Sequence, residues 1–126
     1  MIVKLTNQDE NFYNYMGKFF GSRIVQAKTK DRLYDDNEKV WYLNMNEDNK
    51  VLSFVSVVDR TIKNLYTTEM DDLIVLLKEI TKDIKLLPST VPLCYEEAYK
   101  TCNLKITRLG TYKNFVVIRS VNNEQL

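Results

Sequence analysis

The stretch Lys50–Asp59, KVLSFVSVVD, constrains the fold more than any other part of this sequence. Its apolar side chains occupy both sets of alternating positions, so a strand built from it is largely apolar on both faces. A strand of this kind must be covered on both sides, which places it in the middle of a sheet. We therefore expect other structural elements to pack above and below this strand.

Two flanking segments extend the predicted sheet. Val40–Asn46 is a second β-rich run, and only Glu47–Asn49 separates it from the first, which predicts an antiparallel hairpin. Thr61–Thr67 begins directly after Asp59 and Arg60 and is predicted to be the next strand. The middle of the chain is therefore predicted to form three successive strands.

A helix is predicted to begin directly after the third of these strands. Apolar side chains recur at helical spacing between Met70 and Ile84, so they share one face. Thr68, followed three residues later by Asp71, fits a capping box that satisfies free backbone N–H groups at the helix start. Three acids stand near that start, where the helix dipole favours them: Glu69, Asp71 and Asp72.

The N-terminal part of the chain is predicted to be helical. Residues 9–20 place Phe12, Met16, Phe19 and Phe20 on one helical face. Residues 22–34 form either a second short helix or an irregular turn. These helices are candidates to cover one face of the sheet.

The C-terminal part is predicted to add one short segment, one helix and two strands. Residues 85–91 are the short segment, and residues 92–103 are the helix, with Pro92 in its first turn. Residues 104–120 supply the two closing strands. We therefore predict a single α+β domain, residues 1–126, whose mixed, mostly antiparallel sheet carries helices on both faces.

Composition excludes several classes of function. Of the 126 residues, 44% are apolar and 28% charged, as in ordinary globular proteins. No apolar run reaches about 20 residues, so we expect no membrane span, and the polar N-terminal segment predicts no signal peptide and a cytoplasmic location. The sequence has no histidine, which excludes Ser-His-Asp and Cys-His nucleophiles. Two cysteines alone are a poor set of zinc ligands, so no metal site is expected.

The element order and several short motifs resemble the GNAT superfamily of N-acetyltransferases. The segment Glu96–Lys105, EEAYKTCNLK, is similar to the family ending A-x-x-x-Y-E-K-x-G-F, with Tyr99 at the position of the family tyrosine. Asn103 and Leu104 then stand for the usual Gly and Phe. The hairpin Val40–Val57 resembles the family's central hairpin, and KNLYT matches the end of its fourth strand. The resemblance covers most of the chain and implies a GNAT-like fold.

The chain departs from this family where the cofactor should bind. GNAT proteins carry Q/R-x-x-G-x-G/A after the fourth strand, and its backbone N–H groups hold the pyrophosphate of acetyl-CoA. Here the strand ends at Thr67 and the helix follows at once with TEMDD, which offers neither Gly nor Arg. An acid and a phosphate about 4 Å apart repel by about 1–4 kcal/mol. We therefore expect no ordinary acetyl-CoA binding and no cofactor.

The first functional hypothesis is an accessory protein of GNAT-like fold that acts as a binding or interaction module. Its partner is another protein or a second copy of itself, since the last strand, NFVVIR, is apolar on both faces and lies near the chain end, where an edge strand invites pairing. The composition, rich in Asn, Lys, Tyr and Asp, resembles that of proteins from AT-rich bacteria and their phages or plasmids. A phage or mobile-element origin is expected on this basis.

The second hypothesis is a divergent N-acyltransferase that uses acetyl-CoA or another acyl-CoA. The resemblance assigns Tyr99 as general acid, and Asp59 or Glu69 is then the candidate general base. If a CoA thioester binds, it does so at the end of the fourth strand, at Tyr66, Thr67 and Thr68. The structural alternative for Tyr99 is a tyrosine that packs at the edge of the core.

The third hypothesis is nucleic-acid binding through the helical N-terminal region. Basic residues interleave with aromatic ones there, and the candidate contacts are Lys18, Ser22, Arg23 and Lys28. The structural alternative is a helix end that packs two phenylalanines beneath solvated charges. The net charge of +1 for the whole chain does not by itself require nucleic acid.

Overall fold

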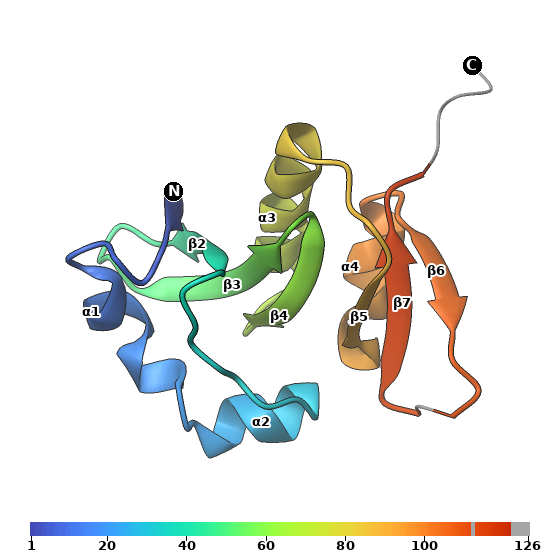
Figure 1. Ribbon diagram of the computed structural model, residues 1–126, viewed down its shortest axis with the longest axis horizontal. Coiled ribbons are helices and arrows are strands. Elements are labelled where there is room, and N and C mark those ends of the chain that lie inside the picture. The colour runs from blue at the N-terminus through green and yellow to red at the C-terminus, as the bar shows by residue number, and fades with distance from the viewer. Residues whose placement is uncertain (112, 122–126) are drawn as a thin grey trace.

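The computed structural model of the protein describes residues 1–111 and 113–121 (Figure 1). Its strands form two antiparallel sheets. The larger has the order β1-β2-β3-β4, with bounds Ile2–Leu5, Val40–Met45, Val51–Val58 and Thr61–Thr67. The smaller has the order β5-β7-β6, with β5 at Ser89–Pro92, β7 at Phe115–Arg119 and β6 at Lys105–Arg108.

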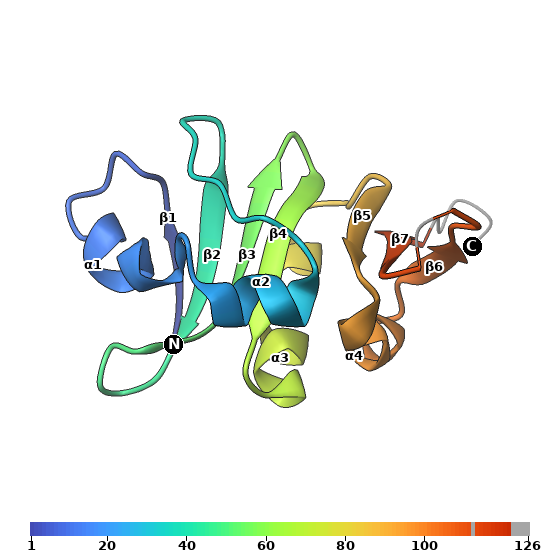
Figure 2. The same cartoon turned by 90° about the horizontal axis from the view of Figure 1, so that it is seen from below.

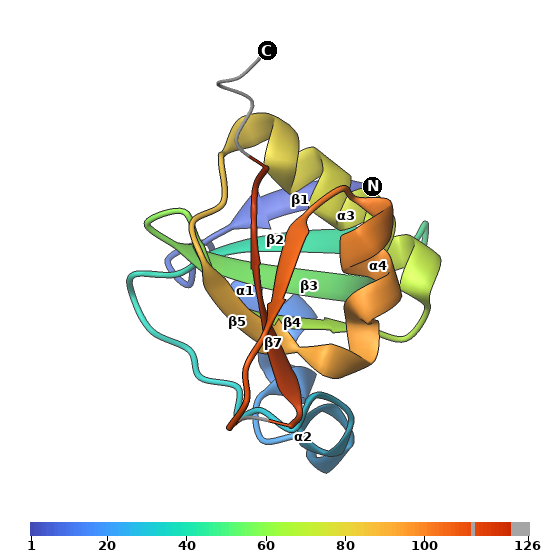
Figure 3. The ribbon, with the colours of Figure 1, turned by 90° about the vertical axis from the view of Figure 1, so that its right-hand side faces the viewer.

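Helices cover the strands and confirm the predicted α+β class. The α-helices are α1 (Phe12–Met16), α2 (Arg23–Thr29), α3 (Met70–Asp83) and α4 (Glu96–Thr101). Two short 3₁₀ helices, η1 (Gly17–Phe19) and η2 (Leu93–Tyr95), precede α2 and α4. Figure 2 shows α1 and α2 on one side of the larger sheet, and Figure 3 shows α3 and α4 together. None of the helices in the described ranges is long and apolar enough to cross a membrane.

The strand β3 is central, as its two apolar faces predicted. Phe54 and Val55 are neighbours in β3, and both are fully buried, on opposite faces of the sheet. Val55 belongs to the hydrophobic cluster that includes Leu77 of α3, and Phe54 belongs to the cluster that includes Phe12 of α1. Truncating a buried leucine to alanine in such a core costs about 2–5 kcal/mol. The packing of both faces therefore fixes the position of this strand.

The two sheets meet at β4 and β5, which run in the same direction. The backbone N–H of Leu87 donates to the carbonyl oxygen of Arg60 at 2.9 Å, just before these strands begin. Two residues further along each segment, the backbone N–H of Ile62 donates to the side-chain oxygen of Ser89 at 2.9 Å. β4 and β5 belong to separate sheets, and no further backbone hydrogen bond joins them in the part of the chain that the structure describes; we call the space between their C-terminal ends the gap.

The start of α3 corrects one prediction from the sequence. The capping box of Thr68 and Asp71 does not form, because the N-cap is Glu69 and no side chain caps the helix. The backbone N–H of Thr68 instead donates to Leu52 at 3.3 Å and so continues the pairing of β3 with β4. The strand pairing thus extends past the predicted helix start and takes Thr68 out of the cap.

Two other predictions also differ from the structure, and one strand was missed. β7 lies between β5 and β6, so the last strand is not an edge, and pairing with a second copy through it is ruled out by its own neighbours. Pro92 is the last residue of β5 and not part of a helix. β1 was not predicted, because its four residues are too short to establish a pattern. Among the described strands, β1 and β6 form the outer edges.

Candidate functional site

The gap between β4 and β5 is filled by the side chain of Tyr95. This residue ends η2 and is only 1% exposed. Its hydroxyl lies 3.3 Å from the backbone nitrogen of Thr67, from which it accepts, and 3.3 Å from the carbonyl oxygen of Thr67, to which it donates. Burial raises the pKa of Tyr95, so the phenol stays neutral and can make both contacts.

Tyr99, the candidate general acid, is enclosed in the core. It is fully buried on α4, and its hydroxyl donates to the carbonyl oxygen of Pro92 at 2.7 Å. Burial raises the pKa of Tyr99, and the nearby Cys94 and Tyr95 raise it further. The hydroxyl therefore links α4 to the end of β5.

The structure does not bring the two candidate bases together. Asp59 lies in the tight turn between β3 and β4, where it and Arg60 adopt left-handed conformations with φ of 48° and 65°. Glu69 lies beyond the other end of β4, at the N-cap of α3. The seven residues of β4 span about 23 Å. Both carboxylates are exposed, and each stands at a different end of the sheet.

The predicted cofactor-binding residues are engaged within the protein. Tyr66 packs its ring against Phe54 and Phe19, with centroid distances of 5.7 and 6.0 Å. The hydroxyl of Thr67 donates to the carbonyl oxygen of Glu69 at 2.6 Å, and its backbone groups contact Tyr95. Thr68 is exposed, with its N–H used in the strand pairing. These three consecutive residues therefore have different surroundings and do not share one cavity.

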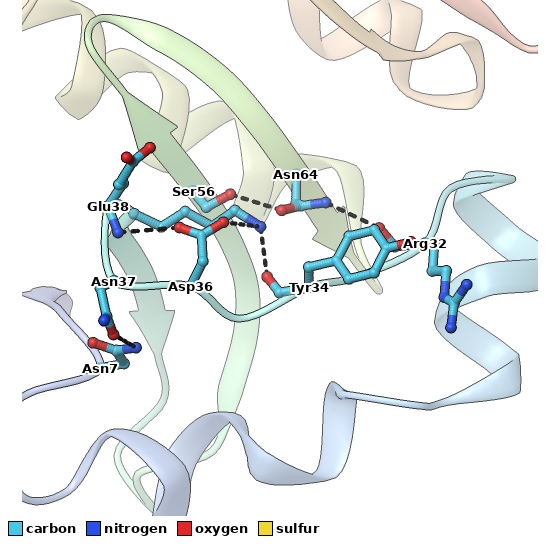
Figure 4. Close-up of polar contacts among 9 residues, drawn as sticks. Asn7, Arg32, Tyr34, Asp36, Asn37, Glu38, Ser56 and Asn64 are labelled. Atoms are coloured by element: carbon cyan, nitrogen blue, oxygen red, sulfur yellow. Dashed lines mark hydrogen bonds and ion pairs between the residues drawn. The ribbon is translucent and has the colours of Figure 1, made fainter.

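A polar pocket of about 370 Å³ lies between residues 31–39 and the strands β3 and β4. Figure 4 shows the hydrogen bonds of its lining residue Asn64, whose side-chain oxygen accepts from the buried hydroxyl of Ser56 at 3.0 Å. The side-chain nitrogen of Asn64 then donates to the carbonyl oxygen of Arg32 at 3.4 Å. Buried polar groups are stable only when hydrogen-bonded, and this pair attaches the loop to the sheet.

Lys39 supplies a buried positive charge to the polar pocket. Lys39 is only 5% exposed. Its Nζ donates to the carbonyl oxygen of Tyr34 at 2.5 Å and forms an ion pair with the carboxylate of Asp36 at 3.6 Å. The same nitrogen lies 5.9 Å from the ring centroid of Tyr34 and 5.7 Å from that of Trp41. These contacts compensate for the lost hydration of the ammonium group and hold it in one place.

Asp31 joins the polar pocket to a second cavity. This second cavity, about 350 Å³, lies where β4 and β5 are still close, and its lining includes Asp31, Lys63, Thr90 and Phe115. Burial raises the pKa of the Asp31 carboxyl, and the backbone N–H of Arg32, Asn64 and the charge of Lys39 partly oppose the shift. A half-buried carboxylate at this junction can accept hydrogen bonds from a polar or cationic ligand.

Sequence reasoning missed the residues of the polar pocket. Asn64 occupies a polar position in a strand, and such positions are expected to face solvent. Lys39 ends a polar run of residues that is typical of a surface loop. Only the folding of residues 31–39 over the sheet buries both side chains, so the sequence offered no signal for them.

The candidate nucleic-acid contacts lie at or near α2. Lys18, Arg23 and Lys28 are exposed, and Ser22 is the N-cap, whose hydroxyl oxygen accepts from the N–H of Val25 at 3.3 Å. The Nζ of Lys28 lies 5.9 Å from the ring centroid of Tyr95, so it faces the filled gap. Lys28 thus lies at the opposite end of α2 from Ser22 and Arg23, beside η2.

The cysteine and acidic side chains are the candidate metal ligands of this chain, which has no histidine. Within residues 1–111 and 113–121, no group of three or more such ligands is placed to hold an ion. Cys94 is exposed and Cys102 is half-buried, and both are free thiols. Partial desolvation of the sulfur atoms raises the pKa of both thiols, although the Cys94 residue as a whole is exposed, and this lowers their reactivity.

Comparison with models of known protein families and with curated proteins found no match to this chain. The chain is therefore defined by its own fold and by the geometry of its candidate site. It is an α+β protein with two antiparallel sheets, a tyrosine in the gap between them, and a polar pocket over β3 and β4.

Proposed function

We propose that this chain is a GNAT-fold accessory protein that does not use acetyl-CoA in the ordinary way and acts as a binding module. From β2 onward its elements follow the order from which the resemblance was drawn, and β1 precedes them. In that family an acyl-CoA would use an open gap between the fourth and fifth strands. The two strands in question here are β4 and β5.

One observation carries the proposal: the hydroxyl of Tyr95 bonds to both backbone groups of Thr67 inside this gap. A pantetheine chain would have to displace a buried aromatic side chain and replace both hydrogen bonds. Leaving a buried backbone group unpaired costs about 1–3 kcal/mol. The exposed acid Asp71 in the first turn of α3 adds repulsion toward a pyrophosphate.

The polar pocket is the binding site that this proposal favours for a small polar ligand or a polar side chain of a partner. Its buried groups, Lys39 and Asn64, are held in place by contacts within the protein, so little ordering is needed on binding. We retain the expected cytoplasmic location and the origin in a phage or mobile element as part of the proposal. Self-association through β7 is not part of it.

Thermal unfolding with acetyl-CoA and with CoA tests this proposal. A ligand present at 100 times its Kd stabilises a protein by about 2.7 kcal/mol, which is a rise of several degrees in Tm. We expect no rise at 1 mM of either compound for the wild-type protein or for Tyr95→Phe, which keeps the gap filled. An active GNAT enzyme serves as positive control.

A rise in Tm of the wild-type protein would overturn the proposal and favour the divergent N-acyltransferase instead. Release of free CoA thiol from acetyl-CoA in the presence of amines would then establish turnover. The Tyr95→Ala variant, which removes the ring, shows whether that side chain is what blocks the gap. Of the wild-type protein and the two variants, we expect Tyr95→Ala to show the largest change in Tm on addition of CoA.

A further inference from the structure

A third cavity, of about 260 Å³, lies between η1, α2 and the residues that follow α2. Its floor is apolar, formed by Phe19, Val25 and Leu33. Tyr34 also lines it, and the other polar side chains of the lining are those of Ser22, Gln26 and Arg32. Each of these three side chains can donate a hydrogen bond, and the cavity therefore suits a ligand rich in acceptors.

Arg32 is held in position for such a ligand. Its backbone N–H donates to the carboxylate of Asp31 at 2.9 Å, and its carbonyl oxygen accepts from Asn64 at 3.4 Å. Its guanidinium carbon lies 5.2 Å from the ring centroid of Tyr34. Figure 4 shows the Arg32 side chain leaving the loop on the side away from Ser56. These backbone hydrogen bonds and the contact with the Tyr34 ring leave the guanidinium N–H donors of Arg32 available to a ligand.

The side of this cavity formed by η1 and α2 is positively charged. Residues 16–30 contain four basic side chains and no acidic one. Lys18 and Arg23 are exposed and adjoin the lining residues Phe19 and Ser22 in sequence. Among the described residues, neither of them nor Arg32 takes part in an ion pair. We call Lys18, Ser22, Arg23, Gln26 and Arg32 the α2 basic surface.

We propose that the α2 basic surface binds the phosphate backbone of nucleic acid. Phosphate oxygens only accept hydrogen bonds and carry negative charge, which matches this set of donors and cations. The planar guanidinium of Arg32 suits one phosphate group bound in the cavity. Lys18 and Arg23 suit the neighbouring phosphates along the same nucleic-acid strand. The inference goes beyond the proposed function, because it assigns nucleic acid to the α2 basic surface and not to the polar pocket.

An anionic membrane is the less suitable partner for this surface. A helix that lies on a membrane needs a broad apolar face. Ile24, at 75% exposed, is the one large apolar side chain that α2 turns to solvent. A single exposed isoleucine among charged residues is common on ordinary protein surfaces.

Fluorescence anisotropy of a labelled 20-nucleotide strand, and of the matching duplex, tests the proposal in 50 and 200 mM salt. Three phosphate contacts give a salt slope of about −2 on a single strand, so affinity should fall roughly 15- to 20-fold over this range. The double variant Arg23→Gln/Arg32→Gln should reduce the size of this slope by about 1.4. Fluorescence of Trp41 verifies that each variant is folded.

The matched control is Lys85→Gln/Lys105→Gln, which removes two exposed charges far along the chain from α2. This control should retain the wild-type affinity and slope. Equal losses in the two double variants, or no binding by the wild-type protein at 50 mM salt, would overturn the proposal. Binding to phosphatidylserine vesicles without binding to either oligonucleotide would do so as well. None of the surface residues lies in the gap filled by Tyr95, so a response to CoA leaves this test unaffected.

Discussion

The hydroxyl oxygen of Tyr95 lies 3.3 Å from both the nitrogen and the carbonyl oxygen of Thr67. Thr67 ends β4 of the larger sheet, whereas Tyr95 follows β5 of the smaller one. One phenol group thus joins the two sheets where their backbones no longer pair. This contact satisfies two buried backbone groups that would otherwise need water or a ligand.

Tyr95→Phe should therefore destabilise the protein. The ring continues to fill the gap, but the backbone N–H and carbonyl of Thr67 lose a partner, at a cost of about 1–3 kcal/mol. Urea unfolding measures the loss. Tyr34→Phe, at a half-exposed tyrosine, is the control and should stay within about 0.5 kcal/mol of the wild type. Equal stability of the two variants would contradict the role given to the Tyr95 hydroxyl.

Ser56 and Asn64 should be energetically coupled. Ser56→Ala and Asn64→Ala each break the buried 3.0 Å hydrogen bond, and the second also frees the loop at Arg32. We expect losses of about 1–2 kcal/mol for Ser56→Ala and more for Asn64→Ala. A double-mutant cycle should give a coupling of about 0.5–1.5 kcal/mol. Additive losses would show that the two side chains act independently.

The start of α3 should respond to substitution at Glu69 and not at Thr68. Glu69 occupies the N-cap with extended backbone angles but makes no capping hydrogen bond. Glu69→Ser supplies a short oxygen acceptor and should stabilise the protein by about 0.5–1 kcal/mol. Thr68→Ala should change stability by less than about 0.5 kcal/mol, since its side chain caps nothing. A larger loss of stability for Thr68→Ala would indicate that the capping box of Thr68 and Asp71 does form.

Asp31→Asn should change how stability depends on pH. The pKa of Asp31 is raised on folding, so its stabilising contribution is complete below the unfolded value of 3.8 and is lost as pH rises through the folded value. The variant should therefore gain up to about 0.5 kcal/mol relative to the wild type at pH 7.

Unfolding in urea between pH 3 and pH 7 measures the effect of Asp31→Asn. The gain should shrink as pH falls, because the wild-type carboxyl becomes neutral like the amide. The amide oxygen can still accept from the backbone N–H of Arg32, so this contact is kept in the variant. A variant that is less stable than the wild type at pH 7, by a margin that disappears toward pH 3, would show that the pKa of Asp31 is lowered on folding and not raised.

The regular elements of the fold were largely predictable from the sequence. β3 was placed at the centre from its two apolar faces, and α3 was found from apolar spacing that begins at Met70. Both signals extend over eight residues or more, so local pattern dominates there. β1 has only four residues, and the helix start at Glu69 depends on how far β4 continues its pairing.

The candidate site was much less predictable. Tyr99 was singled out by a resemblance, yet the structure encloses its hydroxyl against Pro92. Asp59 and Glu69 were considered as alternatives for one role, and β4 separates them. Asn64 and Lys39 gave no signal, because a polar residue in a strand or loop is normally exposed.

The sequence by itself determined the longer strands and helices, among them β2, β3, β4 and α3, because the spacing of apolar side chains is a local property. It also determined the positive charge of residues 16–30. Only the tertiary structure decided that β7 lies between β5 and β6, that Tyr95 enters the gap beside β4, and that Lys39 is buried. These features depend on contacts between residues far apart in the chain, whose relative positions are fixed only when both faces of the sheets are packed.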